Sequence, residues 1–160
     1  MRSKLYPQER TVGSFKCNNP RCLTFKNIQE CDTFTSHVTK EAFKINHCFN
    51  CNSKCLVYLL SCKVCGKQYV GSTTDKFRFR WNNYKNCQRK AERGEDHMQK
   101  YLHDHFLSED HDGLLNNVYI IFIDKTDPSD PERREEFWRT KLRTLAPLGL
   151  NVEEDRKSVV

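Results

Sequence analysis

The chain is 160 residues long; 37% of its residues are hydrophobic, 30% are charged, and its mean hydropathy is −0.81. So polar a chain buries only a modest core, which suits one small domain with an appendage or two very small domains. The longest apolar run, Val118 to Ile123, is far shorter than the about 20 residues of a membrane span. The N-terminus also lacks the apolar region of a secretion signal. The sequence therefore predicts an intracellular protein without a membrane partner.

The net charge of +6 is distributed unevenly along the chain. Residues 1–54 hold nine Lys and Arg against four Asp and Glu, residues 55–93 hold nine against two, and residues 94–160 hold nine against fifteen. The basic middle part suits a surface that faces phosphate groups, although a solvated basic helix has the same composition. The candidate nucleic-acid contacts are Lys67, Arg78, Lys85 and Arg89.

Nine cysteines are many for this length. Their odd number, their short spacings and the missing secretion signal favour metal ligation over disulfides. After a flexible basic leader over residues 1–16, the cysteine-rich residues 17–54 predict weak strands at Thr33–Thr35 and Ala42–Ile45. This segment is expected to need bound zinc to fold. Spacing does not settle which side chains converge; the candidate ligands are Cys17, Cys22, Cys31 and Cys51.

Two short apolar runs, Leu56–Ser61 and Gln68–Gly71, flank a turn at Gly66 and predict a β-hairpin. Asp75 is placed to cap a helix that runs to about Lys90. Three aromatic residues repeat along one face of that helix, which predicts that this face is buried. They are Phe77, Trp81 and Tyr84.

A second helix is expected over His97–Leu107, after a polar break. The segment Asn117–Asp124 is apolar almost throughout, which predicts a strand at the centre of the sheet. Asp130 is the expected N-cap of a last helix over residues 131–145, which has proline at its first position.

The element order β-β-α-α-β-α over residues 55–153 predicts a small α+β domain with a mostly antiparallel three-stranded sheet flanked by helices. The cysteine-rich residues in front of it are expected to form a zinc-stapled N-terminal segment. Residues 154–160, which hold two acidic and two basic residues, are expected to form a disordered tail.

Two tyrosine motifs of the hairpin, Val57-Tyr58 and Tyr69-Val70-Gly71, are followed by Arg80 eleven residues after Tyr69. This order resembles the GIY-YIG nuclease superfamily, with Leu56 in place of the first glycine of its name. The resemblance implies that Tyr58 and Tyr69 bring their hydroxyls into one shallow cleft, where one of them positions or deprotonates the attacking water. By themselves, two such residues would more simply be half-buried tyrosines of a sheet.

The resemblance assigns Arg80 to clamping a phosphate with its guanidinium. Four residues later many members carry histidine, whereas this chain has Tyr84, which leaves the general base open. His97 follows a break, as a site histidine does in the phage homing enzymes of the family. Its alternative is an ordinary residue at a helix N-terminus.

The stretch Arg133–Trp138 resembles the Arg-x-Glu-x-Phe-Trp helix of the family. The resemblance makes Glu135 the carboxylate that binds a catalytic Mg²⁺ or Mn²⁺ ion. Phe137 and Trp138 are expected to lie on the buried side and to hold the helix on the sheet. Asn151 matches the closing asparagine of the family, which supports the phosphate site.

A Cys-x-x-Cys pair lies between the two tyrosine motifs, a place that most members leave without cysteines. This feature narrows the resemblance to the endonuclease domain of Penelope-like retroelements. Together with two histidines downstream, the pair suits a closed structural zinc site that links the hairpin turn to the second helix. His103 competes with His105 for the third position. The expected ligands are Cys62, Cys65, His105 and His111.

These resemblances imply a metal-dependent DNA endonuclease that nicks double-stranded DNA by phosphodiester hydrolysis. In Penelope-like elements the nick supplies a 3′-hydroxyl that primes reverse transcription. The expected partners are therefore double-stranded DNA and a reverse transcriptase domain or ribonucleoprotein of the parent element, in the nucleus. The alternative is a zinc-stapled nucleic-acid-binding module without catalysis, which the departures at Leu56 and Tyr84 favour. A zinc-dependent protein-interaction domain, the third reading, would bind DNA weakly and with little salt dependence.

Overall fold

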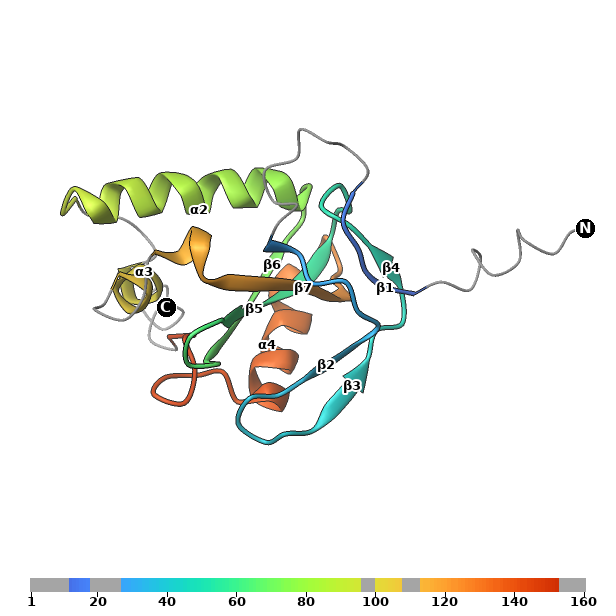
Figure 1. The fold of residues 1–160 in the computed structure, drawn as a ribbon. Helices are drawn as coiled ribbons and strands as arrows, with labels where there is room; N and C mark the ends of the chain where they lie inside the picture. The colour runs from blue at the N-terminus through green and yellow to red at the C-terminus, as the bar shows by residue number, and fades with distance from the viewer. Residues whose placement is uncertain (1–11, 18–26, 96–99, 108–112, 153–160) are drawn as a thin grey trace, which may run out of the picture.

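The computed structural model of the chain describes residues 12–17, 27–95, 100–107 and 113–152. Its main sheet has three antiparallel strands, β5 (Leu56–Cys62), β6 (Gln68–Thr73) and β7 (Val118–Lys125), in the order β6-β5-β7 (Figure 1). The predicted hairpin is formed by β5 and β6. The fold is of the α+β class, as the sequence predicts.

The central strand is β5, so the prediction that residues 117–124 lie at the centre of the sheet is wrong. The outer edge of β7 is covered by the N-terminal segment instead. The N–H of Gln29 donates to the carbonyl of Ile120 at 2.9 Å, and the N–H of Phe122 donates to Ser14 Oγ at 3.0 Å. Because this segment shields β7 from water, the strand is mostly buried and has the apolar pattern of a central strand.

The α-helices of the described residues are α2 (Phe77–Glu92), α3 (Lys100–Phe106) and α4 (Pro131–Leu142), and a 3₁₀ helix, η2 (Leu114–Asn116), precedes β7. Asp130 is the N-cap of α4 and Pro131 follows it, as predicted. The N-cap of α2 is Lys76 rather than Asp75, whose carboxylate accepts a hydrogen bond from the Lys76 N–H at 2.7 Å. Within these ranges, no helix combines the length and the apolar character that crossing a membrane requires.

The helices α2 and α4 lie on opposite sides of the sheet (Figure 1). On one side, the ring of Phe77 from α2 packs edge-on against Tyr58 and Phe122, with centroid distances of 4.9 and 5.1 Å. On the other side, Trp138 of α4 packs against Phe34 of the N-terminal segment at 5.2 Å. Side chains from both helices can therefore meet only around an edge of the sheet.

The described strands of the N-terminal segment are β1 (Gly13–Ser14), β2 (Thr33–Thr35), β3 (Ala42–Lys44) and β4 (Cys48–Phe49). The predicted pair β2 and β3 is antiparallel, and β1 pairs with β4 in parallel. Ser36 Oγ donates to the carbonyl of Leu142 at 2.8 Å, and the N–H of His37 donates to Gln68 Oε1 at 2.9 Å. The buried apolar residues of this segment and of the sheet form one cluster. The described part of residues 17–54 thus shares one core with the rest of the fold.

Phe137 and Trp138 differ in their burial. Trp138 is 8% exposed, and its Nε1 donates to Asp124 at 2.7 Å. Phe137 is 42% exposed and lies under the guanidinium of Arg134, 4.7 Å from it. The prediction of a buried position is therefore confirmed for Trp138 and wrong for Phe137, because adjacent helix positions point about 100° apart.

Candidate active site and metal centre

Within the described residues, the predicted catalytic side chains gather around β6, an edge strand of the sheet. The register pairs Tyr58 with Gly71 and Leu60 with Tyr69, so Tyr58 and Tyr69 are diagonal neighbours on one face. Tyr69 is half-buried, whereas Tyr58 is only 1% exposed. The expectation that both hydroxyls open into a shallow cleft is therefore wrong for Tyr58, which lies in the core under α2.

Tyr84 of α2 is the hydrogen-bond partner of Tyr58. Their hydroxyl oxygens lie 2.6 Å apart, and both side chains are buried. Burial raises the pKa of both phenols well above the ordinary value, and the neighbouring Tyr69 raises it further. Both phenols therefore stay protonated at neutral pH, whereas a general base needs a pKa near the working pH. This pair forms a buried support, and Tyr69 is the more accessible phenol.

Gly71 makes the close packing of Tyr58 possible. A Cβ atom at this position would lie 2.5 Å from Tyr58 Oη, which is shorter than real Cβ contacts allow. The phenol of Tyr58 thus lies directly over the backbone of β6. This contact gives a physical reason for glycine at the end of the Tyr69-Val70-Gly71 motif.

Arg80 reaches β6 from α2. Its Nη2 donates to the carbonyl oxygen of Ser72 at 3.1 Å, while its buried Nε has no hydrogen-bond acceptor within the described residues. The pKa of Arg80 is raised, chiefly by the phenol of Tyr58 and against the effect of burial, and Glu135 contributes to the rise. The site therefore holds a charged, half-buried guanidinium, a group that suits binding of a phosphate.

Glu135 reaches Ser72 from the opposite side of the sheet. Its Oε1 accepts a hydrogen bond from Ser72 Oγ at 2.6 Å, and its Oε2 lies 3.4 Å from Nη2 of Arg139. The Glu135 side chain is 17% exposed. Glu135 Oε1 and Arg80 Nη2 both bind Ser72, so the carboxylate and the guanidinium meet at one residue of β6.

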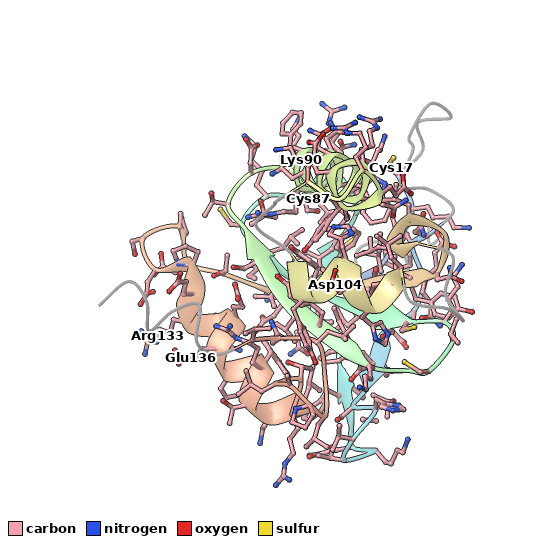
Figure 2. The ribbon with its side chains drawn as sticks, turned by 90° about the vertical axis from the view of Figure 1, so that its left-hand side faces the viewer. Cys17, Cys87, Lys90, Asp104, Arg133 and Glu136 are labelled. Carbon is pink, nitrogen blue, oxygen red and sulfur yellow. The ribbon has the colours of Figure 1, made fainter. Side chains whose placement is uncertain are left out.

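The other acidic residues of α4 turn away from this site. Glu132 and Glu136 are exposed. Figure 2 shows Glu136, together with Arg133, on the outer side of the helix. Within α4, Glu135 is thus the carboxylate that faces the sheet, as the motif predicts.

Asn151 holds β6 in place with its buried side chain. Its Nδ2 donates to the carbonyl of Val70 at 3.0 Å. Its Oδ1 accepts from the N–H of Val70 at 2.9 Å and from the hydroxyl of Thr144 at 2.6 Å. The amide thus pairs with Val70 as a neighbouring strand would, next to Tyr69. Asn151 supports the site by fixing this strand.

Three of the predicted zinc ligands converge where the hairpin turn meets α3. The ligand atoms of Cys62, Cys65 and His105 lie within 4.8 Å of one another, and Cys65 Sγ is 3.4 Å from His105 Nε2. Zn–S and Zn–N bonds of about 2.3 and 2.0 Å place such atoms about 3.5 Å apart in a tetrahedral site. Two thiols and an imidazole at these separations fit a metal ion such as zinc.

The hairpin turn is built for this arrangement. Burial raises the pKa of the Cys62 thiol, and hydrogen bonds from the backbone of Cys65 and Val64 oppose the rise. Gly66 has a φ of +87°, and a Cβ there would lie 2.6 Å from the ring of His37. Only glycine suits both the positive φ and this close approach, so Gly66 allows the turn that follows Cys65.

His103 and His105 have different surroundings although both lie on α3. His105 is half-buried beside Cys65. His103 is fully buried, and its ring centroid lies 6.5 Å from that of Tyr84. Of the two histidines, His105 is the one that lies with Cys62 and Cys65 in the possible metal-binding group, so its role as the third ligand stays a prediction. The same short helix thus contributes to the possible metal-binding group and lies beside Tyr84 of the buried tyrosine pair.

Other predicted site residues are not part of a described cluster. Across the described ranges, one group of three or more possible metal ligands is formed, at Cys62, Cys65 and His105. The N-terminal zinc site is therefore not assembled by its described candidates, which are Cys17, Cys31 and Cys51. The remaining candidates lie outside the described residues; they are Cys22, His97 and His111.

The candidate nucleic-acid contacts differ in exposure. Arg78 and Arg89 are exposed on α2, and Lys67 and Lys85 are half-buried. The guanidinium of Arg78 lies 5.1 Å over the ring of Phe79, which is itself 45% exposed. Exposed cations beside an exposed ring suit contact with a nucleic acid, which stays a prediction.

Two residues of the site, Ser72 and Arg139, were not singled out by the sequence reasoning. Ser72 directly follows Gly71, and strand alternation turns it to the face opposite Gly71, where α4 lies. Arg139 follows Glu135 by four residues, which is the spacing of side-chain pairs on a helix. Both spacings could have indicated these contacts once the sheet and α4 were placed.

No family model, curated protein or solved structure matches the chain. The resemblance to a nuclease therefore rests on the motifs and on the geometry of the residues that carry them.

Proposed function

We propose that this chain is a DNA endonuclease of the GIY-YIG type that hydrolyses a phosphodiester bond with a bound Mg²⁺ or Mn²⁺ ion. The observation that carries the proposal is the meeting of Arg80 and Glu135 at Ser72. The two side chains come from helices on opposite sides of the sheet. Phosphodiester hydrolysis needs a group that binds the metal ion and a group that binds the phosphate. Glu135 and Arg80 would supply them beside the phenol of Tyr69.

In the proposed reaction a water molecule loses a proton as its oxygen bonds to phosphorus, and the bond from phosphorus to the 3′-oxygen breaks. The 3′-oxygen takes up a proton and leaves as a hydroxyl, and the phosphate stays on the 5′ side. Arg80 binds a non-bridging oxygen and stabilises the charge that develops there. Tyr69 orients the water, and the buried pair of Tyr58 and Tyr84 supports it. Glu135 would hold the divalent ion, which would supply Lewis acidity at the phosphate.

The second metal centre is proposed as a structural zinc site with His111 as its fourth ligand. A closed set of two cysteines and two histidines leaves no open coordination position, so this zinc takes no part in the reaction. The cysteine pair in the hairpin turn also supports a likeness to the endonuclease of Penelope-like retroelements. A nick with a free 3′-hydroxyl would then prime reverse transcription by the polymerase of the parent element.

Nicking of supercoiled plasmid in Mg²⁺ or Mn²⁺ tests the proposal. Glu135→Gln keeps the shape of the side chain and removes the charge, and Glu136→Gln makes the same change on the exposed side of α4. We expect the wild type and Glu136→Gln to nick and Glu135→Gln to be inactive. Retardation of DNA without nicking by the wild type would favour the non-catalytic binding module. Equal nicking by all three proteins would refute the assignment of Glu135.

A further inference from the structure

Ser72 connects the candidate metal ligand with the candidate phosphate ligand. Its hydroxyl donates to Glu135 Oε1 at 2.6 Å, and its carbonyl oxygen accepts from Arg80 Nη2 at 3.1 Å. Ser72 is paired with Val57 of the central strand β5, so the sheet fixes its backbone. Through this one residue, a side chain of α4 and a side chain of α2 share a rigid reference point.

The hydroxyl of Ser72 orients the carboxylate of Glu135. A separation of 2.6 Å is typical of a hydroxyl that donates to an ionised carboxylate. The other carboxylate oxygen faces Arg139, which is 6% exposed. Protein groups thus contact both carboxylate oxygens of Glu135 and orient the carboxylate. Because an ionised carboxylate offers about four acceptor positions, capacity remains for a cation.

The carbonyl of Ser72 orients the guanidinium of Arg80. The five N–H donors of a guanidinium lie in one rigid plane, so a bond to one of them fixes the direction of the others. Arg80 Nε is buried and has no hydrogen-bond acceptor in the part of the chain that the structure describes. The bond from Arg80 Nη2 is accepted by the backbone carbonyl of Ser72, so substitutions of the Ser72 side chain leave this bond in place.

The next hydroxyl along β6, that of Thr73, makes different contacts. Thr73 Oγ1 donates to the carbonyl of Asp75 at 3.3 Å and accepts from its N–H at 3.2 Å, in the turn before α2. Alternation along the strand turns Ser72 and Thr73 to opposite faces. The bond to Glu135 is therefore specific to position 72.

We propose that Ser72 is a positioning residue that sets the affinity of Glu135 for the catalytic divalent ion, an inference that rests on the proposed function. Loss of a group that hydrogen-bonds to a metal ligand typically lowers metal affinity or activity by about 10–100-fold. Removing the Ser72 hydroxyl should therefore raise the half-saturating Mn²⁺ concentration by about tenfold or more. Binding of DNA without metal should stay unchanged.

The test compares Ser72→Thr with Ser72→Val, two side chains of the same shape that differ in the hydroxyl and that both suit a strand. The first readout is the Mn²⁺ concentration at half-maximal nicking. The second is Mn²⁺ binding to the protein without DNA, followed by the electron paramagnetic resonance of free Mn²⁺. Ser53→Ala, which removes a half-buried hydroxyl from a turn of the N-terminal segment, controls for the loss of a hydroxyl elsewhere.

We expect Ser72→Thr and Ser53→Ala to follow the wild type in both readouts, and Ser72→Val to need about tenfold or more Mn²⁺. The same Mn²⁺ dependence in the Thr and Val variants would overturn the inference, while nicking by the wild type would leave the proposed function standing. Conversely, a wild type that neither nicks nor binds Mn²⁺ through Glu135 would overturn the proposed function and the inference with it. If the wild type binds Mn²⁺ without nicking, the electron paramagnetic resonance measurement still tests the inference, because it compares Mn²⁺ binding by the Thr and Val variants directly. Should Ser72→Val not fold, Ser72→Ala takes its place.

Discussion

The buried hydrogen bond between Tyr58 and Tyr84 predicts a particular pattern of stability changes. Tyr84→Phe removes one hydroxyl and leaves Tyr58 Oη, 2.6 Å away in a fully buried place, without this partner. An unsatisfied buried polar group costs about 1–3 kcal/mol, so the free energy of unfolding should fall by this amount. Tyr58→Phe should have the same effect. Replacing both tyrosines removes both polar groups, so the double variant should be closer to the wild type than either single variant.

Urea unfolding of the four proteins, followed by tryptophan fluorescence at constant pH and zinc concentration, measures these free energies. Trp81 is a suitable probe because its ring lies 6.1 Å from that of Tyr84. Unchanged m-values would show that the surface exposed on unfolding is the same. If the effects of the two single replacements simply add in the double variant, the two hydroxyls are not bonded to each other and the assignment is refuted.

The same tyrosine pair predicts a loss of stability at alkaline pH. Burial raises the pKa of Tyr58 and Tyr84 in the folded protein, so the unfolded chain releases these protons first, near pH 10. Their contribution to stability is thus constant below about pH 10 and falls above it, by about 1.4 kcal/mol per pH unit for each phenol. In Tyr84→Phe the free energy of unfolding should therefore fall less steeply with pH in this range than in the wild type. An equally steep fall in both proteins would contradict the burial of Tyr84.

Three further predictions concern strand β6, the metal and the reaction. Gly71→Ala brings a methyl group to 2.5 Å from Tyr58 Oη and should cost about 1–3 kcal/mol in the free energy of unfolding; an unchanged value would mean that the phenol lies elsewhere. Chelation of zinc, or Cys62→Ser, should lower Tm, and added zinc should restore it in the wild type alone; a Tm indifferent to chelator would exclude a stabilising metal. Tyr69→Phe should slow single-turnover nicking more than Tyr84→Phe, because Tyr69 is the more accessible phenol, and the reverse order would point to Tyr84 as the residue nearer the water.

Features that depend on a few neighbouring residues can be predicted from the sequence. Gly66 between two apolar runs indicates the turn of the hairpin, and Pro131 after Asp130 indicates the start of α4. The helical spacing of the aromatic residues predicts the buried face of α2, which contains Phe77, Trp81 and Tyr84. In each case the chemistry of the turn, of the cap or of one helical period determines the local structure.

Features that depend on how the elements are packed cannot be predicted in this way. The apolar pattern of β7 is the same whether a strand or the N-terminal segment covers its edge, so the pattern does not reveal that β5 is central. The pairing of Tyr58 with Tyr84, and the contact of Ser72 with Glu135, depend on where α2 and α4 lie on the sheet. Motifs select the residues of the site, and tertiary packing determines which of them touch.

The central claim is that Arg80 and Glu135 act together on one phosphate. The most direct test is the single-turnover nicking rate of the wild type, Arg80→Ala, Glu135→Gln and the double variant at saturating Mn²⁺. We predict that each single change slows nicking by at least about 100-fold, and that the double variant is hardly slower than the single ones, because residues that act as a unit are not additive. A double variant slowed by the product of the two single effects, or a Glu135→Gln variant as fast as the wild type, would contradict this account.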